Sequence, residues 1–179
     1  MRPYRLAAAV AVAVAAAVVA GGYGAGRSPA PSAPGTASVV RVVDGDTVRV
    51  KLAGKEEPVR LIGIDTPETH GAGGLRECFG KEATARLEAL LPKGTAVRVV
   101  RDVEARDRYR RLLAYLYREE DGMFVNLVLA EEGFAAALTI PPNVAHSSRF
   151  VAAAAEARRR SLGLWGRCGD ADRPIGSRR

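Results

Sequence analysis

Four acidic residues lie where strands are expected to end or turn, so their side chains can meet outside a hydrophobic core. They are Asp44, Asp46, Asp65 and Glu68. Hard cations such as Ca²⁺ bind carboxylate and carbonyl oxygens at about 2.3–2.6 Å. Asp46 and Asp65 can supply two carboxylates, and the Thr66 carbonyl can supply a third oxygen before Pro67 turns the backbone away. Spacing alone leaves a second interpretation open, because Asp-Gly-Asp is also a common turn.

Two arginines provide candidate ligands for an anion. Arg60 is the one charged residue in the otherwise apolar run 59–64, and a planar guanidinium suits either a phosphate or a neighbouring carboxylate. Arg60 and Asp65 would lie on opposite faces of an ideal strand. Both can reach one site only if the strand bends or Asp65 lies beyond its end. Arg111 opens another predicted strand and completes the candidate phosphate site.

A basic stretch precedes Arg111 and contains Arg106, Arg108 and Arg110. Such a run of charges is usually a solvated loop. Tyr109, which lies within it, can stack on a base, although an exposed tyrosine is equally ordinary without that role.

The composition limits the class of protein. The chain has 179 residues, of which 47% are apolar and 26% charged, which excludes a wholly disordered chain and a multi-span membrane protein. The formal net charge of +7 favours a polyanionic partner. Residues 1–37 contain three arginines and no acid, so the remainder of the chain is only mildly basic.

The N-terminus has the layout of a targeting segment. Arg2 and Arg5 precede an apolar run of 15 residues at 6–20, which is shorter than the roughly 20 residues that span a bilayer. We therefore expect export, with residues 1–26 as a signal peptide or, if uncleaved, an N-terminal anchor. Gly, Pro and Ser at 27–37 predict a flexible linker, and residues 170–179 form a basic C-terminal tail.

Cys78 and Cys168 are the two cysteines of the chain, and they lie 90 residues apart. Export would favour a disulfide between them, worth about 4 kcal/mol in an entropic model. Two free, buried thiols are the alternative. Neither cysteine lies among the acids and arginines above, so any activity should survive reduction. His70 and His146 lack the spacing of a zinc site.

The elements that must position these residues form a mixed pattern. Alternating apolar and polar residues predict five short strands, and helical spacing predicts about three helices. The predicted strands lie within 38–52 as a pair joined at Asp44-Gly45-Asp46, and at 59–64, 95–101 and 112–117; the predicted helices lie at 81–91, at 124–132 and from Ser147 or Ser148 to 162. This pattern predicts an α+β domain at 38–169 with a five-stranded barrel of the OB type.

The order of the motifs resembles the staphylococcal nuclease (thermonuclease) family, in particular its exported bacterial members. The matching stretches are 43–47, 60–68, 79–83, 107–117, 126–133, 142–143 and 163–165. The resemblance implies an OB barrel with three helices and Ca²⁺-dependent cleavage of DNA and RNA phosphodiesters. We expect little sequence specificity, single-stranded or locally melted substrates, and a monomeric enzyme.

By this resemblance, Asp46, Asp65 and the Thr66 carbonyl are the Ca²⁺ ligands. Asp44 is an acid that supports the ligands, and Glu68 is the general base that activates water.

The resemblance also assigns residues that contact the nucleotide. Arg60 and Arg111 bind the phosphate, while Arg108 and Tyr109 flank the bound nucleotide. Two positions depart from the family pattern: Arg110 replaces a glycine in the turn before Arg111, and Leu138 replaces a tyrosine near the nucleotide.

Two other functions compete with the enzyme. The same barrel could serve as a binding module for nucleic acid or protein without catalysis, or as an exported structural domain whose acids and arginines pair with one another. A degenerate copy should lack some of the acids or arginines. This chain retains all five side chains that the chemistry needs, namely Asp46, Arg60, Asp65, Glu68 and Arg111.

Overall fold

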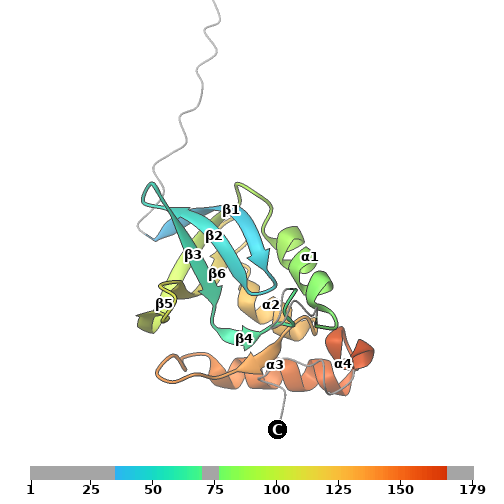
Figure 1. Cartoon of the computed structure of the whole chain (residues 1–179). Coiled ribbons are helices and arrows are strands. Elements are labelled where there is room, and N and C mark those ends of the chain that lie inside the picture. The colour runs from blue at the N-terminus through green and yellow to red at the C-terminus, as the bar shows by residue number, and fades with distance from the viewer. Residues whose placement is uncertain (1–34, 70–76, 169–179) are drawn as a thin grey trace, which may run out of the picture. The chain divides into compact units, whose positions relative to one another are not determined.

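The computed structural model describes residues 35–69 and 77–168, all within one compact unit at 32–179 (Figure 1). The predicted signal segment at 1–26 and the tail at 170–179 lie outside these residues. The predicted linker at 27–37 ends too late, because the first strand begins at Thr36. Within the described ranges, no helix is long and apolar enough to cross a membrane.

Five strands close into a barrel, which confirms the predicted OB-type architecture. In their order around the barrel they are β1 (Thr36–Asp44), β2 (Thr47–Leu52), β3 (Lys55–Leu61), β6 (Leu112–Arg118) and β5 (Ala96–Arg106). β3 and β6 are parallel, and the other neighbours are antiparallel. Alternate residues such as Val48, Val50 and Val59 are fully buried, so the barrel interior is the main core.

The chain bends sharply after β3, and this bend replaces the single strand predicted at 59–64. Gly63 has a φ of +86°, and a Cβ there would lie 2.2 Å from the Phe150 ring, so only glycine fits. Beyond the bend, β4 (Gly63–Asp65) pairs with β7 (Ala136–Leu138), a strand that the sequence did not predict. The buried Asn126 side chain donates to the Ile62 carbonyl at 2.9 Å and so ties the bend to a helix.

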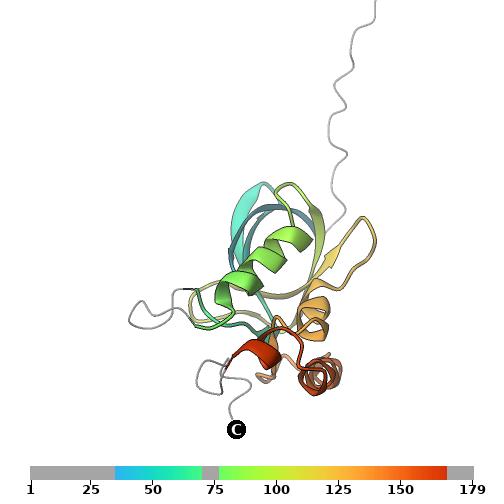
Figure 2. The same ribbon diagram turned by 90° about the vertical axis from the view of Figure 1, so that its right-hand side faces the viewer.

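In the described part of the chain three helices have seven or more residues, in agreement with the predicted number. α1 (Gly80–Leu90) crosses one end of the barrel and buries Ala83, Leu87 and Leu90 there (Figure 2). α2 (Val125–Glu131) packs against α3 (Ser147–Arg159), and a single turn, α4 (Leu164–Arg167), follows.

The predicted serine cap is wrong, because His146 precedes α3 without a side-chain capping bond. α3 also ends earlier than predicted, since Ser161 takes a left-handed φ of 54°.

β5 extends to Arg106 through a stretch that the charge pattern predicted to be loop. Its pairing with β6 is interrupted between Arg101 and Arg106. Asn143 fixes this irregular part by accepting the Glu104 N–H at 2.8 Å and donating to the Glu104 carbonyl at 3.1 Å. The loop after β7 therefore lies against β5.

A second, smaller core lies under α3 and α4 and includes the disulfide. It buries Ala136, Ala154, Ala157, Leu164, Trp165 and Cys168. The predicted pairing is present, since Cys78 and Cys168 form a disulfide with their Cα atoms 5.8 Å apart. The bond joins the start of α1 to the end of α4.

Candidate active site

The turn between β1 and β2 carries Asp44 and Asp46 and lies directly against the residues that follow β4. A Cβ on Gly45 would lie 2.6 Å from Thr66 Oγ1 and 2.9 Å from the Ala83 Cβ, so glycine permits this close approach. The Asp44 carboxylate accepts the Gly45 N–H at 2.7 Å, which shapes the turn. Two segments separated by 20 residues are thereby brought into contact.

Asp46 is buried, with an exposed fraction of 3%, and its carboxylate is bonded on both oxygens. Oδ2 accepts the Thr66 N–H at 3.3 Å and the Thr66 hydroxyl at 3.2 Å, while Oδ1 accepts the Thr47 hydroxyl at 3.0 Å. Burial raises the pKa of Asp46, Arg60 opposes the rise, and the Asp44 charge adds to it. Thr47 was missed in the sequence because a threonine in a strand carries no functional signal.

Arg60 links the two carboxylates that were predicted to hold a metal. Its Nη1 lies 2.7 Å from Asp46 Oδ2, and its Nη2 lies 3.1 Å from Asp65 Oδ1. Nη1 also donates to the carbonyls of Leu61 and Ile64 at 2.9 and 3.2 Å. These carbonyls lie on either side of the bend, so the bend brings Arg60 and Asp65 to one site although their spacing would separate them on a straight strand.

The donors at this site fit a hard cation. Asp46 and Asp65 offer carboxylates and Thr66 a carbonyl, which suits Ca²⁺ or Mg²⁺ better than a metal that prefers thiolate or imidazole. Among the residues that the structure describes, no three His, Cys, Asp or Glu side chains are grouped as a ready metal cage. A cation here would therefore depend on the Thr66 carbonyl and on water in addition to the two carboxylates.

Glu68 follows the buried Pro67 and carries a strongly perturbed carboxyl group. Desolvation, a hydrogen bond with Asp44 and the charges of Asp44 and Asp46 raise the pKa of Glu68 to about 8, and Arg60 opposes them. This rise in pKa favours the protonated form of Glu68. A divalent cation beside it would favour the ionised form, which is the form that can accept a proton from water.

Arg111 is oriented by Asp107, a residue that the sequence analysis missed. Arg111 Nε donates to Asp107 Oδ2 at 2.7 Å, and the Arg111 N–H donates to Asp107 Oδ1 at 2.9 Å. The intervening Arg110 adopts a φ of 65°, so the turn keeps a left-handed residue although no glycine is present. The interval Asp-x-x-x-Arg was the available signal, but it was hidden within a dense run of charges.

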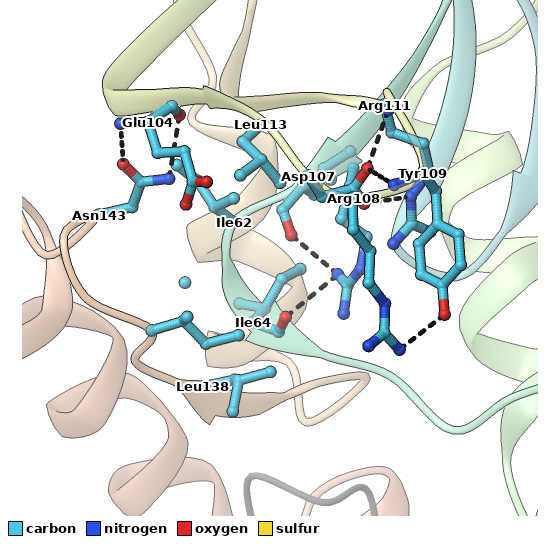
Figure 3. A pocket seen from close by; sticks show the side chains of 14 residues that line it. Ile62, Ile64, Glu104, Asp107, Arg108, Tyr109, Arg111, Leu113, Leu138 and Asn143 are labelled. Atoms are coloured by element: carbon cyan, nitrogen blue, oxygen red, sulfur yellow. Dashed lines mark hydrogen bonds and ion pairs between the residues drawn. The ribbon is translucent and has the colours of Figure 1, made fainter.

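Arg60 and Arg111 line the same cavity of about 460 Å³. Figure 3 shows Arg111 beside Asp107, Arg108 and Tyr109 in its wall. The apolar part of its lining includes Ile62, Ile64, Leu113, Leu138 and Ile140. Arg108 and Tyr109 also line it, with Arg108 Nη2 donating to the Tyr109 hydroxyl at 2.7 Å. Leu138 stands in the wall as an aliphatic side chain, so that position offers no aromatic ring for stacking. The cavity thus combines guanidinium groups with an apolar surface, the combination that suits a phosphate joined to a base.

A closed five-stranded barrel is the architecture of OB-type proteins, which bind oligonucleotides or oligosaccharides. The sequence model of the family described as "Staphylococcal nuclease homologue" matches residues 58–167. The chain belongs to the staphylococcal nuclease family.

Curated relatives cover most of the chain. Thermonuclease of Staphylococcus intermedius is 40% identical over 129 residues, which are 72% of this chain and 75% of that protein. Thermonuclease of Staphylococcus hyicus is 38% identical over 130 residues, 73% of this chain and 75% of that protein. Endonuclease YncB of Bacillus subtilis (strain 168) is 35% identical over 130 residues, 72% of this chain and 61% of that protein.

Proposed function

We propose that the protein is an exported, Ca²⁺-dependent nuclease that hydrolyses phosphodiester bonds of DNA and RNA with little sequence specificity. It acts as a monomer on single-stranded or locally melted substrates. Membership of the family and relatives named thermonuclease or endonuclease support phosphodiester hydrolysis. Export is supported by the N-terminal sequence, in which two arginines precede a short apolar run.

One observation carries the proposal: Arg60 contacts both Asp46 and Asp65 and also lines the cavity that contains Arg111. A cation on the two carboxylates and a phosphate on the two arginines would therefore be neighbours. A bound Ca²⁺ would supply positive charge where the phosphate becomes more negative in the transition state.

The protein's own residues then have separate roles. Arg60 and Arg111 hold the phosphate and draw charge from its oxygens, and Asp107 keeps the Arg111 guanidinium in place. Glu68 accepts a proton from water as the water oxygen bonds to phosphorus, and the opposite phosphorus–oxygen bond breaks. The leaving oxygen takes a proton from solvent, which balances the hydrolysis.

A structural domain whose acids and arginines pair with one another is the second candidate, and one observation favours it. Arg60 and Arg111 are each paired with acids of the same chain, as they would be in a purely structural role. In that case substitution of either arginine would lower stability and leave little catalysis to lose.

Cleavage of denatured DNA, plasmid DNA and RNA distinguishes the two functions. We expect cleavage with Ca²⁺, none after addition of a chelator, and poor cleavage with Mg²⁺, which demands stricter octahedral geometry and loses water reluctantly.

Glu68→Gln should lower kcat by about 10²–10⁴-fold while substrate binding changes little. A folded Glu68→Gln variant with normal kcat would contradict the assignment of the base, and equal turnover with Mg²⁺ would contradict the choice of metal.

A further inference from the structure

Glu77 makes both backbone hydrogen bonds that the described part of the chain shows for Glu68. The Glu68 N–H donates to Glu77 Oε2 at 2.9 Å, and the Glu77 N–H donates to the Glu68 carbonyl at 3.0 Å. These two bonds hold the peptide groups on either side of the Glu68 Cα. The position of the Glu68 carboxyl therefore depends on the position of Glu77.

Glu77 is itself attached to the rest of the fold on its C-terminal side. Its carbonyl accepts the N–H of Gly80, the first residue of α1, at 3.2 Å. The next residue, Cys78, is bonded to Cys168. Cys168 is buried, and its N–H donates to the Leu164 carbonyl at 3.0 Å within the second core.

The Glu68 residue needs such support because it lies outside the strands, three positions after Asp65, the last residue of β4. A misplacement of about 1 Å can lower a rate by about 10²-fold. The buried Pro67 holds one side of Glu68, and Glu77 holds the other.

We propose that Glu77 is a positioning residue for Glu68 and that the Cys78–Cys168 disulfide keeps Glu77 in place, so that turnover depends on the oxidised state of the cysteine pair. This inference rests on the proposed function of Glu68 as the base. It replaces the sequence-based expectation that activity survives reduction, because the disulfide is adjacent to the residue that holds Glu68.

Substitutions of Glu77 test the first part. Glu77→Ala removes the acceptor for the Glu68 N–H and should lower kcat by about 10–100-fold, the usual cost of losing a supporting contact. KM and Ca²⁺ affinity should change much less than kcat. Glu77→Gln keeps a carbonyl acceptor and should restore most of the rate. Glu88→Ala, which changes an exposed glutamate of α1, is the matched control and should leave kcat unchanged.

Removal of the disulfide tests the second part. The double variant Cys78→Ser, Cys168→Ser, assayed well below its melting temperature, should show a lower kcat with little change in KM. When Glu77→Ala is added, the further loss should be small, because both changes release the same residue. Fully additive losses, or a folded double variant with normal kcat, would overturn the role of the disulfide.

Glu68→Gln separates failure of this inference from failure of the proposed function. If Glu68→Gln is inactive while folded Glu77→Ala is normal, Glu77 does not position the base. If Glu77→Ala lowers the melting temperature but not kcat, its role is structural and the inference is wrong. If Glu68→Gln itself keeps normal kcat, the proposed function fails first, and the inference fails with it.

Discussion

Charged side chains at this site neutralise one another, and Arg60 is the clearest case. The Arg60 side chain is 15% exposed, and it pairs with Asp46, whose side chain is 5% exposed. Removing one partner of a buried pair leaves a charge without compensation. Arg111 differs, because its side chain is 31% exposed and water can still reach its pair with Asp107.

Arg60→Met should therefore lower the free energy of unfolding by about 3 kcal/mol or more. Arg111→Met should lower it by about 1 kcal/mol or less. Urea unfolding of both variants measures the difference, and Arg49→Met, which removes an exposed pair with Glu56, is the control. Equal losses at Arg60 and Arg111 would contradict the burial argument. Both variants should also lose kcat, unlike the control.

Arg110 gives a second prediction, about the backbone rather than charge. Its φ of 65° is unfavourable for a residue with a Cβ, by roughly 1–2 kcal/mol. Arg110→Gly should be more stable than Arg110→Ala by about 1 kcal/mol, after the greater entropy of unfolded glycine is included. Urea unfolding checks this order. An alanine variant as stable as the glycine variant would show that the turn has relaxed.

Most site residues could be predicted from their types and from the family resemblance, but their convergence could not. A straight strand would separate Arg60 from Asp65, and the bend depends on Gly63 contacting Phe150, which lies far along the sequence. Contacts of that kind leave no periodic pattern. Glu77 was missed because it acts through the backbone of Glu68, nine residues away, and leaves no sequence pattern. Asp107 was missed because its spacing to Arg111 is hidden within a run of charges.

Among the elements, β5 is longer than predicted: it ends at Arg106, whereas the sequence predicted an end at residue 101. Residues 101–106 are exposed or half-buried throughout, so they lack the apolar alternation that indicates a strand. Their conformation is fixed from outside, by Asn143 at Glu104 and by Asp102 at the loop before α3. The barrel strands with one buried face, in contrast, could be predicted from alternation.

Asp102 makes the stability of this region depend on pH. Its carboxylate accepts the Ala145 N–H at 3.0 Å and the Tyr115 hydroxyl at 2.9 Å. Partial burial alone would raise the pKa of Asp102. The opposite happens, because these two bonds stabilise the carboxylate, as do a bond from the Val103 N–H and the nearby His146. Together they lower the pKa of Asp102 below the usual 3.8. A carboxylate with a lowered pKa stabilises the fold above its unfolded pKa, and that stabilisation is lost as the pH falls toward the folded value.

Asp102→Asn should therefore be less stable than the unchanged protein at pH 7, and the gap should narrow as the pH falls below about 4. Urea unfolding across this range, at constant salt, measures the gap. A gap that stays constant from neutral to acid pH would mean that the Asp102 charge contributes nothing. Glu56→Gln, at an exposed residue of β3, is a suitable control.

At the scale of the whole molecule, two cores are joined through the site. The barrel holds Asp46 and Arg60, whereas the second core under α3 and α4 is tied by Cys168 and Cys78 to the residues that hold Glu68. The disulfide between the two cysteines could be predicted from their number and from the expected export. Its position beside the base could not, because it depends on how α4 packs.

Metal binding should therefore stabilise the entire fold. Asp46 lies in the turn before β2 and Asp65 ends β4, 19 residues later in the sequence. Unfolding separates them, so the unfolded chain should bind a cation only weakly. A ligand that binds the native state alone stabilises it by about 2.7 kcal/mol at 100 times its Kd.

Saturating Ca²⁺ should raise the melting temperature, a chelator should reverse the rise, and Mg²⁺ should give a smaller shift. Asp46→Asn should abolish the Ca²⁺ shift while Asp121→Asn, at an exposed residue remote from the site, should retain it. The same shift in both variants would show that Ca²⁺ binds elsewhere.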